Sequence, residues 1–170
     1  MKKRVICAAA ALALSYGAAA SADERLAAFD GGIGVIPVSS GVGTEATATV
    51  VNRNIVRGVQ PPGQIWVISD LRADVRSDGR ITVDGRGLLL GGGNNIGFNA
   101  NARVFATLIC EAAAPFVERS TTAAGVALEP TGDFRIDDML SSVPAECASP
   151  VLLIRNAANR AWFAAGVPKQ

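Results

Sequence analysis

Apolar and charged residues alternate through the middle of the chain. From Ile65 to Arg76 the odd positions are mostly apolar and the even positions from 70 onward are charged, and the alternation returns from Ile81 to Asp84. A period of two is typical of a half-buried β-strand. A helix through the same apolar residues is a minor alternative, because it would have to ignore this alternation. The pattern predicts a hairpin with one buried face and one solvent-exposed face.

The turn between these two strands decides which residues face each other. A two-residue loop at Asp78-Gly79 would mix apolar and charged residues on each face. A three-residue loop, Ser77-Asp78-Gly79, with glycine in the left-handed region keeps the faces separate. The predicted pairs are Val75 with Ile81 and Ala73 with Val83 on the core face, and Arg72 with Asp84 and Asp70 with Arg86 on the solvent face.

Away from the turn, this hairpin becomes apolar on both faces. Trp66 and Ile68 are expected on the outer face, opposite Leu90 and Leu88, while Val67 and Leu89 continue the inner face. We expect the chain's own loops or terminal segments to cover this apolar region. Self-association through Trp66, Ile68, Leu88 and Leu90 is the alternative.

Short apolar runs between turn residues recur along the rest of the chain, which holds 18 glycines. Pro130-Thr131-Gly132 suits a second hairpin turn, and residues 156–160 suit a longer third one. The expected strands are Ile33–Val38, Ala46–Val51, Gln64–Val75, Arg80–Leu90, Arg103–Cys110, Val126–Glu129, Asp133–Ile136, Val151–Arg155 and Ala161–Ala165. Weak helical patterns cover Asp23–Phe29, Ala112–Arg119 and a turn at Asp137–Leu140. The sequence predicts an all-β sandwich of about seven to nine mostly antiparallel strands, with Greek-key or jelly-roll-like connections.

The N-terminus has the features of a secretory signal peptide. Lys2, Lys3 and Arg4 precede an apolar run from Val5 to Gly17, and Ala20-Ser21-Ala22 follows as a cleavage motif. We expect cleavage before Asp23, giving a signal peptide at 1–22 and a single domain at 23–170, secreted or periplasmic. No later segment is apolar for long enough to span a membrane. Cleavage leaves 13 of the 16 basic residues against 15 acidic ones, so there is no basic excess to predict nucleic-acid binding.

Two cysteines, Cys110 and Cys147, remain after Cys7 leaves with the signal peptide. In an oxidising compartment they predict a disulfide, which the chain-entropy model values at roughly 3 to 4 kcal/mol for a loop of this length. Two free thiols or a metal site are the alternatives. A chain without histidine offers a poor zinc site, and we expect no metal and no cofactor.

Several blocks of the chain resemble a family of small exported bacterial proteins usually described as hypothetical. The blocks are FDGGIGVIPVSS (29–40), GQIWVISDLRADVRSDGRITVDGRGLLLGGGNNIG (63–97), VFATLIC (104–110) and CASPVLLIRNAANRAWFAAG (147–166). The resemblance covers most of the mature chain. It implies export and one domain, and it brings no activity, substrate or site residue.

The residue inventory restricts catalysis. Without histidine, serine- and cysteine-based triads that need a histidine base are excluded, which leaves chiefly carboxylate chemistry. A glycosidase needs two carboxylates across a cleft. Adjacent Asp137 and Asp138 would point to opposite faces of a strand, and the spacing of Glu111, Glu118 and Glu146 indicates nothing specific. We therefore name no catalytic residue.

The loop GGGNNIGFNAN, residues 91–101, is unusual in composition. Its asparagines Asn94, Asn95, Asn99 and Asn101 are candidate binding residues for a sugar, although Gly and Asn are also what a tightly turning connection requires. The loop has no acidic residue, which argues against calcium. We expect an exported non-catalytic domain that binds or builds something at the cell envelope or outside it. The alternative is a carboxylate-dependent enzyme acting on an extracellular glycan.

Overall fold

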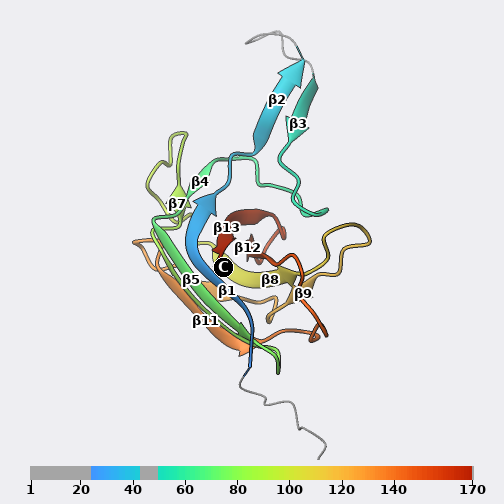
Figure 1. Ribbon diagram of the computed structural model, residues 1–170. Coiled ribbons are helices and arrows are strands. Elements are labelled where there is room, and N and C mark those ends of the chain that lie inside the picture. Colours follow the sequence, from blue (N-terminus) through green and yellow to red (C-terminus); the bar gives the residue numbers. More distant parts are fainter. Residues whose placement is uncertain (1–23, 43–49, 170) are drawn as a thin grey trace, which may run out of the picture.

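Thirteen strands and no helix are present in residues 24–42 and 50–169, the part of the chain that the computed structural model describes (Figure 1). The predicted all-β class is confirmed, while the predicted signal peptide and its cleavage before Asp23 lie outside the described residues. The strands are β1 (Arg25–Gly34), β2 (Val38–Val42), β3 (Val50–Arg53), β4 (Trp66–Val67), β5 (Asp70–Arg76), β6 (Arg80–Arg86), β7 (Leu89–Leu90), β8 (Arg103–Ile109), β9 (Arg119–Ser120), β10 (Val126–Ala127), β11 (Phe134–Met139), β12 (Val151–Asn156) and β13 (Trp162–Pro168).

One antiparallel sheet of nine strands forms the body. Its order is β10-β8-β12-β13-β1-β5-β6-β11, with β9 paired to the C-terminal part of β8, at Thr107 and Leu108. The sheet curls, so that its two ends, β10 and β11, approach each other and enclose the core. Two small sheets complete the described fold: the ribbon β4–β7 lies against the body, and the hairpin β2–β3 projects from it (Figure 1).

The β5–β6 hairpin has the predicted register. Val75 pairs with Ile81, Ala73 with Val83, Arg72 with Asp84 and Asp70 with Arg86. The loop is Ser77-Asp78-Gly79, as predicted: Gly79 has φ 90° and its N–H donates to the carbonyl of Arg76 at 3.0 Å. The carboxylate of Asp78 accepts the N–H of Arg80 at 2.8 Å, which closes the turn. Separation of the two faces therefore determined the register.

The faces reverse at the apolar end of this hairpin. Backbone irregularities at Ile68-Ser69 and at Gly87, where φ is 65°, each shift the alternation by one residue. Trp66, Leu88 and Leu90 are consequently buried and Ile68 is partly buried, whereas Val67 is 47% exposed. The expectation that the chain covers these residues is confirmed. Self-association through Trp66, Ile68, Leu88 and Leu90 is wrong, because three of these side chains belong to the core.

The three weak helical predictions are wrong. Residues 25–29 belong to β1, because pairing with β5 and β13 outweighs the local preference of a short alanine-rich segment. Residues 112–118 are irregular, and Pro115 there disfavours helical backbone in the residue before it. Asp137–Met139 continue β11 along its full pairing with β6.

The second predicted hairpin turn, Pro130-Thr131-Gly132, forms, but the strands on either side of it do not pair with each other. Gly132 (φ 81°) donates its N–H to Glu129, and the backbones of Glu129 and Asp133 bond at 2.9 Å. Beyond this turn the strands part, since β10 pairs with β8 and β11 with β6. The third hairpin is confirmed as β12–β13, with Leu153 opposite Ala165.

The core is continuous and is fastened by the predicted disulfide. Buried side chains from every long strand form one cluster, in which Trp66 stacks on Phe163 with ring centroids 3.9 Å apart. Cys110, at the end of β8, is bonded to Cys147 with an S–S distance of 1.98 Å. The bridge ties the long segment between β11 and β12 to the end of β8.

Candidate functional site

Charged residues form an alternating lattice on the outer face of β5, β6 and β11. Asp84 lies between Arg72 on β5 and Arg135 on β11, so this row reads positive, negative, positive. In the next row Arg86 lies opposite Asp70. Since neighbouring strands are about 4.8 Å apart, donors and acceptors alternate at that spacing across the sheet.

The ion pairs of this lattice extend to flanking strands. Arg135 bonds Asp84 at 2.6 Å, and Arg72 lies 3.6 Å from Asp30 on β1 and 3.8 Å from Asp70. All five side chains are more than a third exposed, so each pair adds only a few tenths of a kcal/mol to stability. The predicted cross-strand neighbours are thus confirmed by the register, but the closest charge contacts lie elsewhere. The ion pairs of the lattice therefore contribute little to the stability of the fold.

A groove of about 710 Å³ lies over the lattice, between it and the segment around the β10–β11 turn. Its wall residues are Asp70, Arg72, Asp84, Gly85, Arg86, Val126, Ala127, Glu129, Asp133, Phe134 and Arg135. Asp133 is held in place, because its carboxylate accepts the N–H of Gly87 at 3.0 Å. Arg86 and Glu129 make no side-chain hydrogen bond or ion pair with any described residue. These two charges are available to a ligand.

A second depression of about 250 Å³ continues the groove toward β1. It shares Arg72 and Asp84 with the first and adds Arg25, Asp30 and Lys169. Together the two depressions make an elongated polar surface across four neighbouring strands. Its length suits an extended ligand better than a small compact one.

Among the carboxyl groups of residues 24–42 and 50–169, two have shifted pKa values, and both shifts are downward. The N–H of Val117, followed by Arg119 at 2.8 Å, lowers the pKa of Glu111 to about 2. The N–H of Thr122 lowers the pKa of Asp138 from its ordinary value. A general acid in a glycosidase needs the opposite shift. Both groups hold loop backbone in place.

The carboxylates considered from the sequence do not form an acid–base pair. Asp137 is exposed and receives a two-pronged contact from Arg80, while Asp138 is held by the backbone of Thr122 and Met139. Glu111 pairs with Arg119 and Glu118 pairs with Arg155. No group of three or more Cys, Asp or Glu side chains within residues 24–42 and 50–169 is placed to hold a metal ion.

The four candidate asparagines lie in the loop between β7 and β8. Asn99 holds the loop to the β10–β11 turn, because its amide donates to the carbonyls of Leu128 and Glu129 at 3.0 and 2.9 Å. Asn94 and Asn95 are exposed near the loop tip, and Asn101 takes a left-handed conformation with φ 49°. Asn99 therefore has a structural role, which is to hold this loop against the β10–β11 turn. Sugar binding by these residues stays a prediction.

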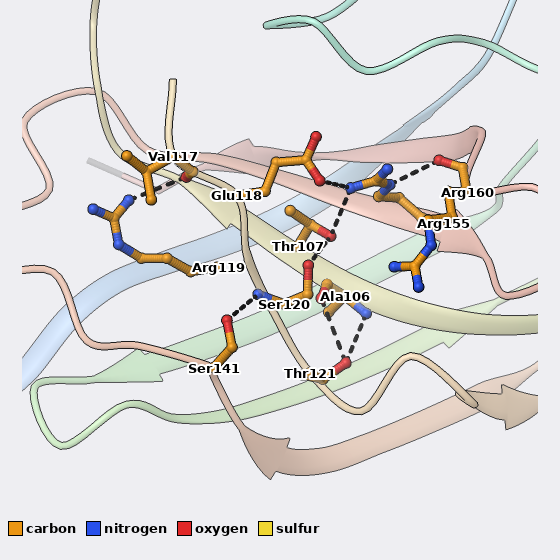
Figure 2. Close-up of polar contacts among 10 residues, drawn as sticks. All are labelled: Ala106, Thr107, Val117, Glu118, Arg119, Ser120, Thr121, Ser141, Arg155 and Arg160. Carbon is orange, nitrogen blue, oxygen red and sulfur yellow. Dashed lines mark hydrogen bonds and ion pairs between the residues drawn. The ribbon is translucent and has the colours of Figure 1, made fainter. Parts of the chain in front are cut away.

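A buried arginine forms a second polar cluster, shown in Figure 2. Arg155 on β12 is 5% exposed, and it donates to Glu118 at 2.5 Å, to the carbonyl of Arg160 at 2.8 Å and to Thr107 at 3.4 Å. Its guanidinium also lies 5.4 Å from the ring centre of Phe105. These contacts fasten residues 111–118 across the outside of β8 and β12.

Hydroxyl groups extend this cluster along β8 and β9. Thr107 and Ser120 share a hydrogen bond of 2.8 Å, the hydroxyl of Thr121 accepts the N–H of Ala106, and Ser141 accepts the N–H of Ser120 (Figure 2). Within the described chain, no buried side-chain nitrogen or oxygen lacks a partner. The cluster therefore has no buried group left over for a ligand, and we assign it to stability.

Sequence reasoning missed both the groove and the role of Arg155. The sequence did contain one indication of the role of Arg155. This residue follows the apolar run VLLI, and a charge in such a strand needs a buried partner. Comparison with known proteins adds nothing, because no family model, no curated protein and no solved structure matches the chain. The resemblance to small exported bacterial proteins accordingly stays a prediction.

Proposed function

We propose that this protein is an exported, non-catalytic binding domain whose groove over β5, β6 and β11 holds an acidic glycan. The observation that carries the proposal is the groove itself: seven charged residues line about 710 Å³, and two of them, Arg86 and Glu129, have no partner in the described chain. Arg86 offers the planar fork of donors that binds a carboxylate. Glu129 and Asp70 offer acceptors for hydroxyl groups.

The alternation of donors and acceptors supports a glycan. A sugar hydroxyl donates and accepts at the same time, so it can bridge an aspartate and an arginine on neighbouring strands. The elongated shape of the two joined depressions accommodates several sugar units. Export is supported by the N-terminal charge and apolar pattern together with the Cys110–Cys147 disulfide.

Calorimetric titration with polygalacturonate, and with neutral dextran as a comparison, tests this function. We expect binding of the acidic polymer, weakened by Arg86→Ala about tenfold or more, as expected when a charge-assisted contact is lost. Arg80→Ala is the matched control, because Arg80 lies at the other end of β6, outside the groove. Equal losses in the two variants, or no binding by the wild-type protein, would exclude the proposed site.

A carboxylate-dependent glycan hydrolase is the second candidate function, because four carboxylates line the groove: Asp70, Asp84, Glu129 and Asp133. The same incubations distinguish the two functions by assay of reducing ends. Release of reducing ends that disappears in Glu129→Gln or Asp84→Asn would favour the hydrolase. Binding without release favours the binding domain.

A further inference from the structure

Exposed apolar side chains gather at the end of the molecule that carries the β4–β7 ribbon. Of the twelve exposed large hydrophobic residues in the described chain, six lie on this ribbon or beside it. We call them the apolar end: Ile36, Val38, Ile65, Val67, Ile96 and Phe98, which are 40–64% exposed. A soluble domain seldom leaves so many large apolar side chains together in water unless the surface is used.

Contacts between these segments show that they form one surface. Ile36, Val38 and Ile65 line a common depression of about 430 Å³ together with Gly92 and Gly93. A side chain at Gly91 would touch both Val67 and Ile65. The loop that carries Ile96 and Phe98 is bonded to β7, since the N–H of Leu90 donates to the carbonyl of Phe98 at 2.9 Å.

The edges of the ribbon are already occupied, so a partner would meet its face. Trp66 donates its N–H to Val35 at 3.1 Å on one side, and Leu90 bonds the 97–98 backbone on the other. Addition of a further strand to the ribbon is therefore disfavoured. Recognition here depends on side chains, which are mostly aliphatic or phenyl groups beside the exposed amides of Gln64, Asn94 and Asn95.

The absence of charge at this end argues against a charged partner. The segments 31–38, 63–69 and 87–101, which build this end, contain no Asp, Glu, Lys or Arg, in contrast to the charged lattice on β5, β6 and β11. A charged partner would lose hydration against such a face without gaining an ion pair. A two-fold interface places the same surface on both sides, and a charge-free face is complementary to itself.

We infer that the apolar end is a self-association surface through which two copies of this chain form a dimer. The hairpin β2–β3 projects beside this surface, as Figure 1 shows, and would flank the second copy. The dimer does not depend on the proposed glycan groove, which lies on other strands.

Sedimentation velocity over a series of protein concentrations tests the dimer. We expect a monomer–dimer equilibrium for the disulfide-bonded protein, and a dissociation constant raised about tenfold or more by Val67→Asp, which places a carboxylate in the interface. Val143→Asp is the matched control, because Val143 is also an exposed valine, at 46% against 47%, but lies far from the ribbon in sequence and outside its contacts. The control is expected to associate as the wild-type protein does.

Far-UV circular dichroism checks that each variant is folded. If Val67→Asp is not, Phe98→Ser in the loop replaces it, since Phe98 is 64% exposed and contributes nothing to the core cluster. A wild-type monomer at every concentration would overturn the dimer, and so would equal weakening by Val67→Asp and Val143→Asp. A monomer that sediments with neutral phosphatidylcholine vesicles would overturn it in favour of a lipid surface.

Discussion

The ion pair between the buried Arg155 and the half-exposed Glu118 is the polar contact whose loss we expect to weaken the fold most. Arg155 is 5% exposed and has three acceptors, whereas the side chain of Glu118 is 46% exposed. Removing one partner of a fully buried pair costs about 3 to 5 kcal/mol. Exposure of Glu118 allows water to replace part of its contact, so we expect Glu118→Ala to lower the free energy of unfolding by about 2 kcal/mol.

A double-mutant cycle separates the pair from its surroundings. Arg155→Met also leaves the carbonyl of Arg160 without its donor, so we expect a loss of about 3 kcal/mol. In the double variant the cost of the lost pair is counted once, and we expect a coupling energy of about 1 to 2 kcal/mol. Urea unfolding of the disulfide-bonded protein measures each free energy. Additive losses, or a loss below about 0.5 kcal/mol for Glu118→Ala, would refute the claim that this pair fastens residues 111–118.

Three further predictions concern the bridge, one turn and acid stability. Replacing Cys110 and Cys147 by serine should lower the unfolding free energy by about 4 kcal/mol in urea, and alkylation of thiols in the unreduced wild-type protein would contradict the bridge. Gly132→Ala should cost at least about 2 kcal/mol more than Gly58→Ala, because both glycines have positive φ but an added Cβ lies 2.6 Å from Leu88 backbone at 132 and meets nothing at 58. Equal melting temperatures would contradict this. Because folding lowers the pKa of Glu111 from 4.5 to about 2, its contribution is complete above pH 4.5 and is lost as the pH falls toward 2. Glu111→Gln should reduce the slope of the unfolding free energy against pH between about 2 and 4.5. An unchanged slope would contradict this contribution of Glu111.

Local rules were sufficient for the β5–β6 hairpin. The loop had to keep Val75 and Ile81 on one face and Asp84 on the other, and one register satisfied both faces. The disulfide followed from the number of cysteines remaining after the predicted export. These features depend on neighbouring residues or on composition, which a sequence displays directly.

Long-range pairing explains what the sequence did not reveal. Residues 25–29 form a strand because β5 and β13 lie on either side, and the local pattern contains neither neighbour. Irregular backbone at Ile68-Ser69 turns Trp66 inward, and irregular backbone at Gly87 turns Leu88 and Leu90 inward. The groove arises because the sheet curls until the β10–β11 turn stands over β6, so that Arg86 and Glu129, 43 positions apart, line one space.

Binding of an acidic glycan in the groove over β5, β6 and β11 is the function that we propose. Backbone amide shifts measured by NMR during titration with galacturonate oligomers test it most directly. We expect the largest shifts on β5, β6 and β11 around Arg72, Arg86 and Arg135, and no shift in the loop around Ile96. Shifts confined to that loop or to the other strands, or no shifts at all, would contradict the claim.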